Sequence, residues 1–342
     1  MKEVKDRYDI AVIGAGAAGV MASLRGVLNN DSVIMFTGSA KDKKKSRAQW
    51  VRKVENIPGF QNLEKGIIDP NKQTIKDIKN GSFASNLDVA QESVEQVLKN
   101  EDGSFKIITD KSTYHADYTV LATGVMDVQP HIEGSIKGVF PYANLQLIDY
   151  CVRCDGHHVK DKETVIIGHN ESAAWVAVML VERYQVPGMT ILTNGQEAQF
   201  SQELWELIEM YQIEIETAPI MEIMGDAKKG IMDGFLLEGS KWIHAGIAFV
   251  SLGMIVYNDL AKSLGAELDS RGFVMTNEKG ESNVENFYAV GDIQAGTKKQ
   301  IYTSWDSAVD ALDDINAKIR RGKRQQKLLN HRFRKENQTT IA

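Results

Sequence analysis

A chain of 342 residues that is 43% hydrophobic and 25% charged can bury a large core, and its length favours two domains over one. The net charge of -6, from 40 basic and 46 acidic residues, argues against nucleic-acid binding as a main task. No apolar run approaches the roughly 18 residues of a membrane span, and the first residues lack the apolar core of a signal peptide; we therefore expect a soluble, cytoplasmic protein.

The first fifty residues predict a βαβ unit. Residues 9–13 (DIAVI) have the composition of a buried strand, and a glycine turn follows at residues 14–19. An apolar helix over residues 20–28 then leads to a parallel strand over residues 31–36. Residues 39–53 are rich in lysine and arginine and predict a charged loop.

The middle of the chain predicts a helix, a meander and a second βαβ unit. The helix covers residues 69–87, and residues 94–121 alternate turn signals and strand runs, which is typical of an antiparallel meander ending in a parallel strand. From residue 164 the order TVIIG, NESAAWVAVMLVERY, MTILT repeats the strand–helix–strand pattern of the N-terminus. Two more strands (IAFVSLG and FYAVGD), a helix over residues 303–320 and a basic tail complete the chain.

The glycine turn matches the dinucleotide-binding pattern in its proper context, between a strand and a helix. Its residues are Gly14, Ala15, Gly16, Ala17, Ala18 and Gly19. The three glycines allow the tight turn, the approach of a pyrophosphate and the packing of helix on strand. The acidic residue that usually follows the second strand is missing, since that strand ends Met-Phe-Thr37-Gly38. We therefore expect the ribose to be held in another way.

The only two cysteines, Cys151 and Cys154, form a C-x-x-C motif. This spacing allows a small disulfide ring, and a lowered thiol pKa makes one sulfur a nucleophile, so the motif predicts redox chemistry. Two alternatives stay open: a zinc site completed by His157 and His158, for which adjacent histidines give poor tetrahedral geometry, and two unreactive core cysteines.

Several motifs in order make the sequence resemble the low-molecular-weight thioredoxin reductase family over about residues 8–320. They are the first glycine turn, Thr37-Gly38, Val54-Glu55-Asn56-Ile57-Pro58-Gly59, Ala122-Thr123-Gly124, Cys151-x-x-Cys154-Asp155-Gly156, and Ala289-Val290-Gly291-Asp292 followed by Lys299-Gln300-Ile301.

The resemblance implies an α/β fold of two Rossmann-like domains in a homodimeric FAD enzyme. The FAD-binding domain would comprise residues 1–126 and 245–320. The inserted domain, residues 127–244, would carry the cysteines, and residues 321–342 would form a basic tail. The substrate it implies is a thioredoxin-like protein or a small disulfide or dithiol.

The resemblance also assigns roles to single residues. Cys154 would face the flavin, Cys151 would attack the substrate disulfide, and Asp155 would move the proton, a task that needs a carboxylic acid with a raised pKa. The alternative for Asp155 is a helix N-cap. The flavin would be lined by the first glycine turn with Thr37 and Gly38, and by Asn56, Thr123, Gly124, Gly291, Asp292, Gln300 and Ile301. Arg47, within Ser46-Arg47-Ala48 where the family has Gly-Gly-Gln, could reach a flavin phosphate or the ring.

The second nucleotide motif departs from the family. It reads Gly168-His-Asn170-Glu-Ser-Ala173, with Asn170 in place of the glycine that meets a pyrophosphate. The family's His-Arg-Arg segment is replaced by Thr193-Asn-Gly-Gln-Glu197, and no cation follows until Lys228. A phosphate without a cationic partner binds poorly, so we expect neither NADPH nor NADH to be the reductant.

Family members without an NADPH site take electrons from ferredoxin, hold a second flavin, or run in reverse as oxygen-dependent dithiol oxidases. We expect the electron donor to be a ferredoxin or another flavin. Three alternatives remain: an NADPH-dependent reductase, an oxygen-dependent dithiol oxidase, and a redox sensor without catalytic turnover. His157 and His158 are candidates for a proton relay near the thiols or for a polar domain edge. The basic tail, residues 320–335, is expected to be partly disordered; alternatively it docks an acidic partner or covers the flavin.

Overall fold

The computed structural model describes residues 5–43, 46–51 and 53–339. The chain divides into two compact units. Unit 1 comprises Met1–Gln49, Ile67–Val125 and Val256–Ala342, and unit 2 comprises Trp50–Gly66 and Met126–Ile255. Among the described residues, no helix combines the length and the apolar character needed to cross a membrane.

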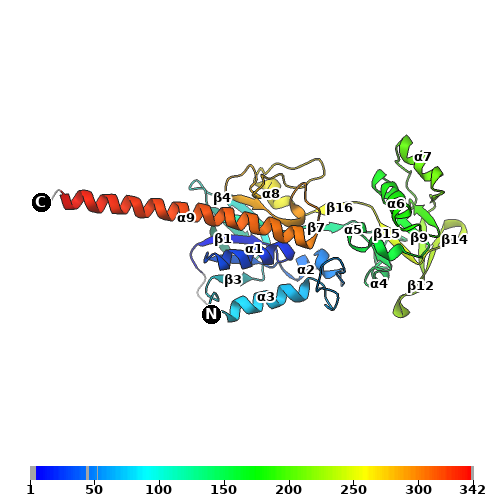
Figure 1. The fold of residues 1–342 in the computed structure, drawn as a ribbon, viewed down its shortest axis with the longest axis horizontal. Coiled ribbons are helices and arrows are strands. Elements are labelled where there is room, and N and C mark those ends of the chain that lie inside the picture. Colours follow the sequence, from blue (N-terminus) through cyan, green and yellow to red (C-terminus); the bar gives the residue numbers. More distant parts are fainter. Residues whose placement is uncertain (1–4, 44–45, 52, 340–342) are drawn as a thin grey trace. The chain divides into compact units, whose positions relative to one another are not determined.

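Unit 1 is built on a seven-stranded sheet (Figure 1). Its strands are β1 (Tyr8–Ile13), β2 (Val33–Phe36), β3 (Leu87–Ala90), β4 (Val94–Lys99), β5 (Phe105–Thr109), β6 (Thr113–Leu121) and β17 (Phe287–Ala289). β3, β2, β1 and β6 run parallel, β5 pairs antiparallel with the first half of β6, and β4 pairs antiparallel with β5 at the sheet edge. β17 pairs in parallel with the second half of β6. The predicted βαβ unit and the meander are both confirmed.

Alternate residues of the central strands feed two separate cores, as the two-residue period of a strand requires. Ile10 and Val12 of β1 face the core that contains α1 (Ala17–Leu28), α3 (Ile68–Asn80) and the first half of α9 (Ile301–Thr339). Ala11 and Ile13 face the opposite core, against α8 (Asp259–Ser263). Both faces of the sheet are therefore covered, as in a doubly wound α/β fold.

The structure shortens the helix expected over residues 69–87. α3 ends at Asn80, Gly81 follows it in an extended conformation, and β3 then pairs with β2 at the sheet edge. The charged loop expected over residues 39–53 contains a short helix, α2 (Ala40–Lys43), and a 3-10 turn, η1 (Arg47–Gln49); residues 44, 45 and 52 of that expectation lie outside the described part of the chain.

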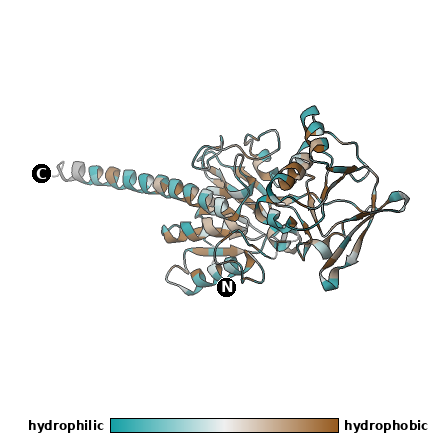
Figure 2. Ribbon diagram, turned by 45° about the vertical axis from the view of Figure 1, so that its right-hand side comes forward, coloured by the Kyte–Doolittle hydropathy of each residue, from teal (hydrophilic) through white to brown (hydrophobic). Residues whose placement is uncertain are grey.

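The last helix is longer than expected. α9 runs through the basic segment that we expected to be partly disordered, and it extends beyond the sheet of unit 1 (Figure 1). The segment contains no proline and is rich in Arg, Lys, Gln and Leu, which are good helix formers. Among the α9 residues whose side chains are described, up to residue 334, the last buried one is Ile319, and Figure 2 shows the turns beyond it mostly hydrophilic. Residues 340–342 of the predicted tail lie outside the described residues.

Unit 2 contains a second, fully parallel sheet in the order β11-β10-β9-β15-β8. These strands are β8 (Ile148–Asp149), β9 (Thr164–Ile167), β10 (Met189–Leu192), β11 (Glu214–Glu216) and β15 (Ile247–Val250). The helices of the unit are α4 (Phe140–Ala143), α5 (Val152–Asp155), α6 (Glu171–Tyr184) and α7 (Gln202–Met210). β12 (Ile220–Asp226), β13 (Ile231–Leu237) and β14 (Lys241–His244) form an antiparallel sheet. The second βαβ unit, β9-α6-β10, is thereby confirmed.

Besides the crossings at either end of residues 50–66, the chain passes between the units within β7 (Val125–Asp127) and within β16 (Met254–Val256), and these two strands pair with each other. We expected the second crossing at residues 244 and 245, but the four buried residues of β15 pair with β9 and β8 in the sheet of unit 2. Residues 50–66 also belong to unit 2, where Trp50 stacks on Phe140 with ring centroids 4.5 Å apart.

Candidate functional site

The glycine turn between β1 and α1 is closely packed at two of its three glycines. A Cβ added to Gly14 would lie 2.3 Å from the carbonyl oxygen of Ala122, and one added to Gly19 would lie 2.0 Å from the carbonyl oxygen of Gly14. A Cβ on Gly16 would meet nothing within 4 Å, and Gly16 gives α1 no side-chain cap. An uncapped helix N-terminus with this open approach offers N–H groups and positive potential to a phosphate. The turn therefore fits a dinucleotide pyrophosphate.

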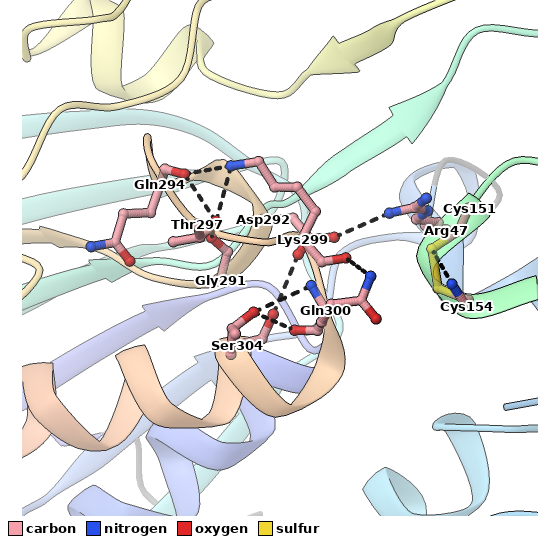
Figure 3. Close-up of polar contacts among 11 residues, drawn as sticks. Arg47, Cys151, Cys154, Gly291, Asp292, Gln294, Thr297, Lys299, Gln300 and Ser304 are labelled. Carbon is pink, nitrogen blue, oxygen red and sulfur yellow. Dashed lines mark hydrogen bonds and ion pairs between the residues drawn. A yellow bond between two sulfur atoms is a disulfide. The ribbon is translucent and has the colours of Figure 1, made fainter. Parts of the chain in front are cut away.

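The close packing of the turn extends to the segment before α9, η5 (Gly291–Ile293). Gly291 has a φ of 76°, and a Cβ on it would lie 2.6 Å from the Cβ of Ala18, so η5 packs directly on the start of α1. Asp292 follows, and its Oδ2 lies 3.6 Å from Nη1 of Arg47 while its Oδ1 accepts a hydrogen bond from Ser304 Oγ (Figure 3). The structure thus brings Arg47 and Asp292 together beside the glycine turn.

Lys299 is a residue of this region to which the sequence reasoning gave no role, although it opens the motif Lys-Gln-Ile. Its Nζ donates to the carbonyl oxygen of Gln294 and to Thr297 Oγ1 at 3.0 Å (Figure 3), and lies 3.8 Å from the ring centroid of Phe273. Burial lowers the pKa of Lys299 to about 8, against a smaller raising effect of Asp292. A lysine whose amine is less basic than usual therefore lies beside the predicted flavin contacts.

Gln300 and Ile301 lie where α9 begins. Gln300 is buried, its backbone N–H donates to Thr303 Oγ1 at 3.3 Å, and its side-chain Nε2 donates to the carbonyl oxygen of Lys299 at 3.1 Å (Figure 3). Ile301 is the first residue of the helix. These bonds hold the first turn of α9, and the backbone N–H of Gly291 donates to Ser307 Oγ at 3.0 Å, which joins η5 to α9.

The end of β2 carries an acidic residue that the sequence reasoning missed. Asp42, in α2, accepts hydrogen bonds on Oδ2 from the backbone N–H of Ser39 at 2.8 Å and from its hydroxyl at 2.9 Å, and another from the hydroxyl of Ser93. Gly38, with a φ of 72°, turns the chain so that an added Cβ would lie 2.8 Å from the Cβ of Asp42. The signal was present in the sequence as an acidic residue six positions after β2, but only the fold of α2 returns it to the strand end.

The remaining predicted cofactor residues fall in both units. Thr37 donates its backbone N–H to Ala90, and Thr123 donates its hydroxyl to the carbonyl oxygen of Tyr257 at 2.8 Å; both lie in unit 1 with Gly124, whose φ is 69°. Asn56 lies in unit 2, with the cysteines. Unit 1 therefore collects every predicted flavin contact except Asn56.

The two cysteines are joined in a disulfide, with an S–S distance of 2.09 Å. Cys151 is the N-cap of α5, and its Sγ accepts a hydrogen bond from the backbone N–H of Cys154 at 3.1 Å (Figure 3). A hydrogen bond that favours the charged form lowers a thiol pKa. After reduction, the same bond would stabilise a thiolate on Cys151.

Asp155 and the two histidines follow the disulfide directly. Asp155 is buried and occupies the N-cap position of the 3-10 turn η2 (Gly156–Val159), although its side chain makes no capping hydrogen bond to that turn. His158 Nδ1 lies 2.8 Å from Oδ2 of Asp149, and the hydrogen bond to Asp149 is the main cause that raises the pKa of His158 to about 8. The proton relay itself stays a prediction.

In the second nucleotide motif, a side chain of the motif itself caps the helix that follows. Asn170 caps α6, accepting on its side-chain oxygen the backbone N–H of Ala173 at 3.2 Å, and the acidic Glu171 is the first residue of the helix. The loop after β10 is held by Thr193, whose hydroxyl donates to the carbonyl oxygen of Gln196 at 2.6 Å. The helix end that would receive a pyrophosphate is thus occupied by the chain's own amide and flanked by a negative charge.

Comparisons with known proteins agree with this geometry. The family model described as pyridine nucleotide-disulphide oxidoreductase matches residues 8–311. A thioredoxin reductase of Treponema pallidum (strain Nichols) is 25% identical over 308 residues, which cover 87% of this chain and 92% of that protein. A ferredoxin--NADP reductase of Halalkalibacterium halodurans is 24% identical over 327 residues, covering 93% and 96%.

The fold is also found among solved structures. The crystal structure of a thioredoxin reductase from Streptococcus pyogenes MGAS5005 aligns with a TM-score of 0.80 at 19% identity and covers 93% of this chain and 99% of that one. At this level of identity the likeness supports the two-Rossmann-domain fold.

Proposed function

The chain belongs to the pyridine nucleotide-disulphide oxidoreductase family and is a flavin-dependent disulfide oxidoreductase of the thioredoxin reductase type, and from this premise we propose that it reduces an external protein disulfide without NADPH. The substrate is a thioredoxin-like protein, as the names of its relatives suggest. The observation that carries the proposal is the contrast between two helix N-termini: α1 is uncapped and open at Gly16, whereas α6 is capped by Asn170.

In unit 1 the residues fit FAD. The turn at Gly14–Gly19 would hold the pyrophosphate, and Asp42, in the helix α2 that follows β2, is a carboxylate that could accept from a ribose hydroxyl. Arg47 and Asp292 offer a cation and an anion beside the turn. A bound flavin would supply the two-electron couple for the disulfide.

In unit 2 the cysteines would carry out the exchange. Two electrons and two protons convert the Cys151–Cys154 disulfide into two thiols. The Cys151 thiolate, stabilised by the Cys154 N–H, attacks one sulfur of the substrate disulfide and releases the other as a thiol. Cys154 then attacks the mixed disulfide, which releases the second substrate thiol and restores the internal disulfide. Asp155 is the proposed proton donor and acceptor in these steps.

The absence of NADPH use rests on charge as well as on the cap. From Thr193 to Ala227 the sequence holds no lysine or arginine, and Glu171 begins the helix that would face the phosphates. Two anions of a dinucleotide would meet an acidic side chain there, with no cation from this segment to offset it. We propose ferredoxin as the donor, because the exposed turns of α9 are strongly basic and ferredoxins are acidic proteins.

An anaerobic titration of the FAD-loaded protein tests the proposal. We expect NADPH to leave the flavin absorbance unchanged, whereas reduced ferredoxin bleaches it and produces two titratable thiols per chain. In Cys154→Ser, the flavin should still be reduced, but turnover of a thioredoxin should be lost. Rapid bleaching by NADPH would refute the donor assignment, and thioredoxin turnover by Cys154→Ser would refute the role of the cysteine pair.

A further inference from the structure

Three potential metal ligands meet in unit 2, outside the disulfide. Oε2 of Glu55 lies 2.7 Å from Nε2 of His157 and 3.2 Å from Nε2 of His158, and the ligand atoms of all three side chains lie within 4.8 Å of one another. Glu55 comes from the segment 50–66, about one hundred positions before η2, so only the fold of unit 2 assembles this group.

A fourth side chain orients one of the ligands from behind. Asp149, at the end of β8, is 4% exposed, and its Oδ2 lies 2.8 Å from Nδ1 of His158. When the Nδ1–H of a neutral His158 donates to this carboxylate, the lone pair of Nε2 faces Glu55 and His157. A buried carboxylate that fixes the tautomer of a histidine is the usual outer support of a metal-binding histidine.

The three ligand side chains are accessible enough for an ion to enter. The side chain of His157 is 49% exposed and that of Glu55 is 35% exposed, while His158 is held at 15%. Because the cysteines are joined in a disulfide, they offer no thiolate, so this group differs from a zinc site built on the C-x-x-C motif.

We propose that Glu55, His157 and His158 form a binding site for a divalent transition metal ion of the zinc type, supported by Asp149. Two imidazole nitrogens and one carboxylate oxygen suit Zn²⁺ and its neighbours, whereas Mg²⁺ and Ca²⁺ prefer sites made of oxygen alone. Three protein ligands leave a coordination position for water or an external ligand. His157 is three residues beyond Cys154, so a bound ion would lie on the segment that carries the redox pair.

Titration of the oxidised, FAD-loaded protein with Zn²⁺ against a chelating dye tests the site, since the oxidised form has no free thiol to compete. We expect one ion per chain. Glu55→Gln and His157→Gln should each weaken binding by at least about 10-fold, and Asp149→Asn by about 10- to 100-fold. His115→Gln and Glu222→Gln, which change exposed residues on β6 and β12, are matched controls and should bind as the parent does.

The result that overturns the proposal is either an absence of Zn²⁺ binding by the parent or binding that both Glu55→Gln and His157→Gln retain. Circular dichroism and flavin absorbance identify a variant that fails to fold. In that event His157→Gln decides the question. The side chain of His157 is half exposed and less buried than that of His158, so its replacement disturbs the fold least. Zinc binding is measured without turnover, so its failure would leave the proposed redox function unaffected, and the converse also holds.

Discussion

At the scale of single residues, the two Rossmann-like units differ at one position of the strand-to-helix turn. Gly16 leaves the N-terminus of α1 open, and Asn170, in the equivalent place before α6, turns its amide onto the backbone N–H of Ala173. A helix whose N–H groups are already capped has less to offer a phosphate. One of the two turns thus suits a dinucleotide, whereas in the other a backbone N–H at the helix N-terminus is already bonded to the side chain of Asn170.

Substitution of Gly16 by valine should separate cofactor binding from folding. Its φ of −74° is accessible to any residue, and an added Cβ would meet nothing of the protein within 4 Å, so we expect the apoprotein to fold normally. The valine would instead occupy the approach path of the pyrophosphate. We expect the FAD content of the purified protein to fall by at least about 10-fold, as measured from the flavin absorbance per chain.

Two further glycine variants serve as controls for Gly16→Val. Gly138→Val changes an exposed glycine of unit 2 that also has open space around it, and it should keep its full FAD content. Gly14→Ala, in contrast, would place a Cβ 2.3 Å from the carbonyl oxygen of Ala122 and should lower the thermal midpoint. Full FAD content in Gly16→Val would show that the cofactor does not lie on this turn.

At the scale of elements, two acidic side chains with opposite pKa shifts hold α9 against the rest of unit 1: Asp31, in the turn between α1 and β2, and Asp313, on α9 itself. Asn316 Nδ2 donates to both carboxylate oxygens of the buried Asp31, at 3.1 and 3.0 Å. One turn earlier on α9, the half-exposed Asp313 accepts from Nε of Arg25 on α1. Burial raises the pKa of Asp31 above its usual 3.8, and the hydrogen bond from Arg25 lowers the pKa of Asp313.

Asp31→Asn should stabilise the protein at neutral pH. Because the folded pKa of Asp31 is above the unfolded value, the folded state binds the extra proton, and the contribution of Asp31 to stability is lost as pH rises from the unfolded value through the folded one. The asparagine removes that loss and can still pair with Asn316. We expect a higher thermal midpoint than the parent at pH 7 and a difference that shrinks as the pH falls toward 4.

Asp313→Asn provides the opposite sign on the same helix. Its lowered pKa means that its stabilisation is present above the unfolded pKa and lost at lower pH, so this variant should be slightly less stable than the parent at pH 7 and equal to it in acid. The effect is small because the ion pair is about half exposed.

A neutral-pH midpoint of Asp31→Asn at or below that of the parent would contradict the argument that burial raises the pKa of Asp31.

The elements were more predictable from sequence than the contacts between them. Both βαβ units, the meander and the helix N-termini follow from hydrophobic period and glycine placement, which act within short stretches of chain. The return of Asp42 to the end of β2, and the meeting of Glu55 with His157, depend on tertiary packing that no local pattern encodes. The strand Ile247–Val250 was predicted as a strand but assigned to the wrong side of the crossing, since four buried apolar residues suit either parallel sheet.

At the scale of the whole molecule, charge is distributed unevenly along the sequence. The chain has a net charge of -6, yet residues 320–334 contain seven lysines and arginines and no acidic residue. All of these residues are exposed on α9, together with the apolar side chains of Leu328, Leu329 and Phe333. A cationic helix on an acidic protein steers an acidic partner to one place, and it does so through the rate of association.

Removal of residues 321–342 should therefore affect electron delivery and not stability. The thermal midpoint should stay close to that of the full chain, because residues 321–334, the removed residues whose side chains are described, are all exposed. In stopped-flow reduction by ferredoxin at low ionic strength, we expect the second-order rate to fall by about 10-fold or more and to lose most of its salt dependence. The double variant Leu328→Ala, Leu329→Ala keeps every charge and should react as the full chain does. Equal rates and equal salt slopes for the full and shortened chains would mean that the donor does not meet this helix.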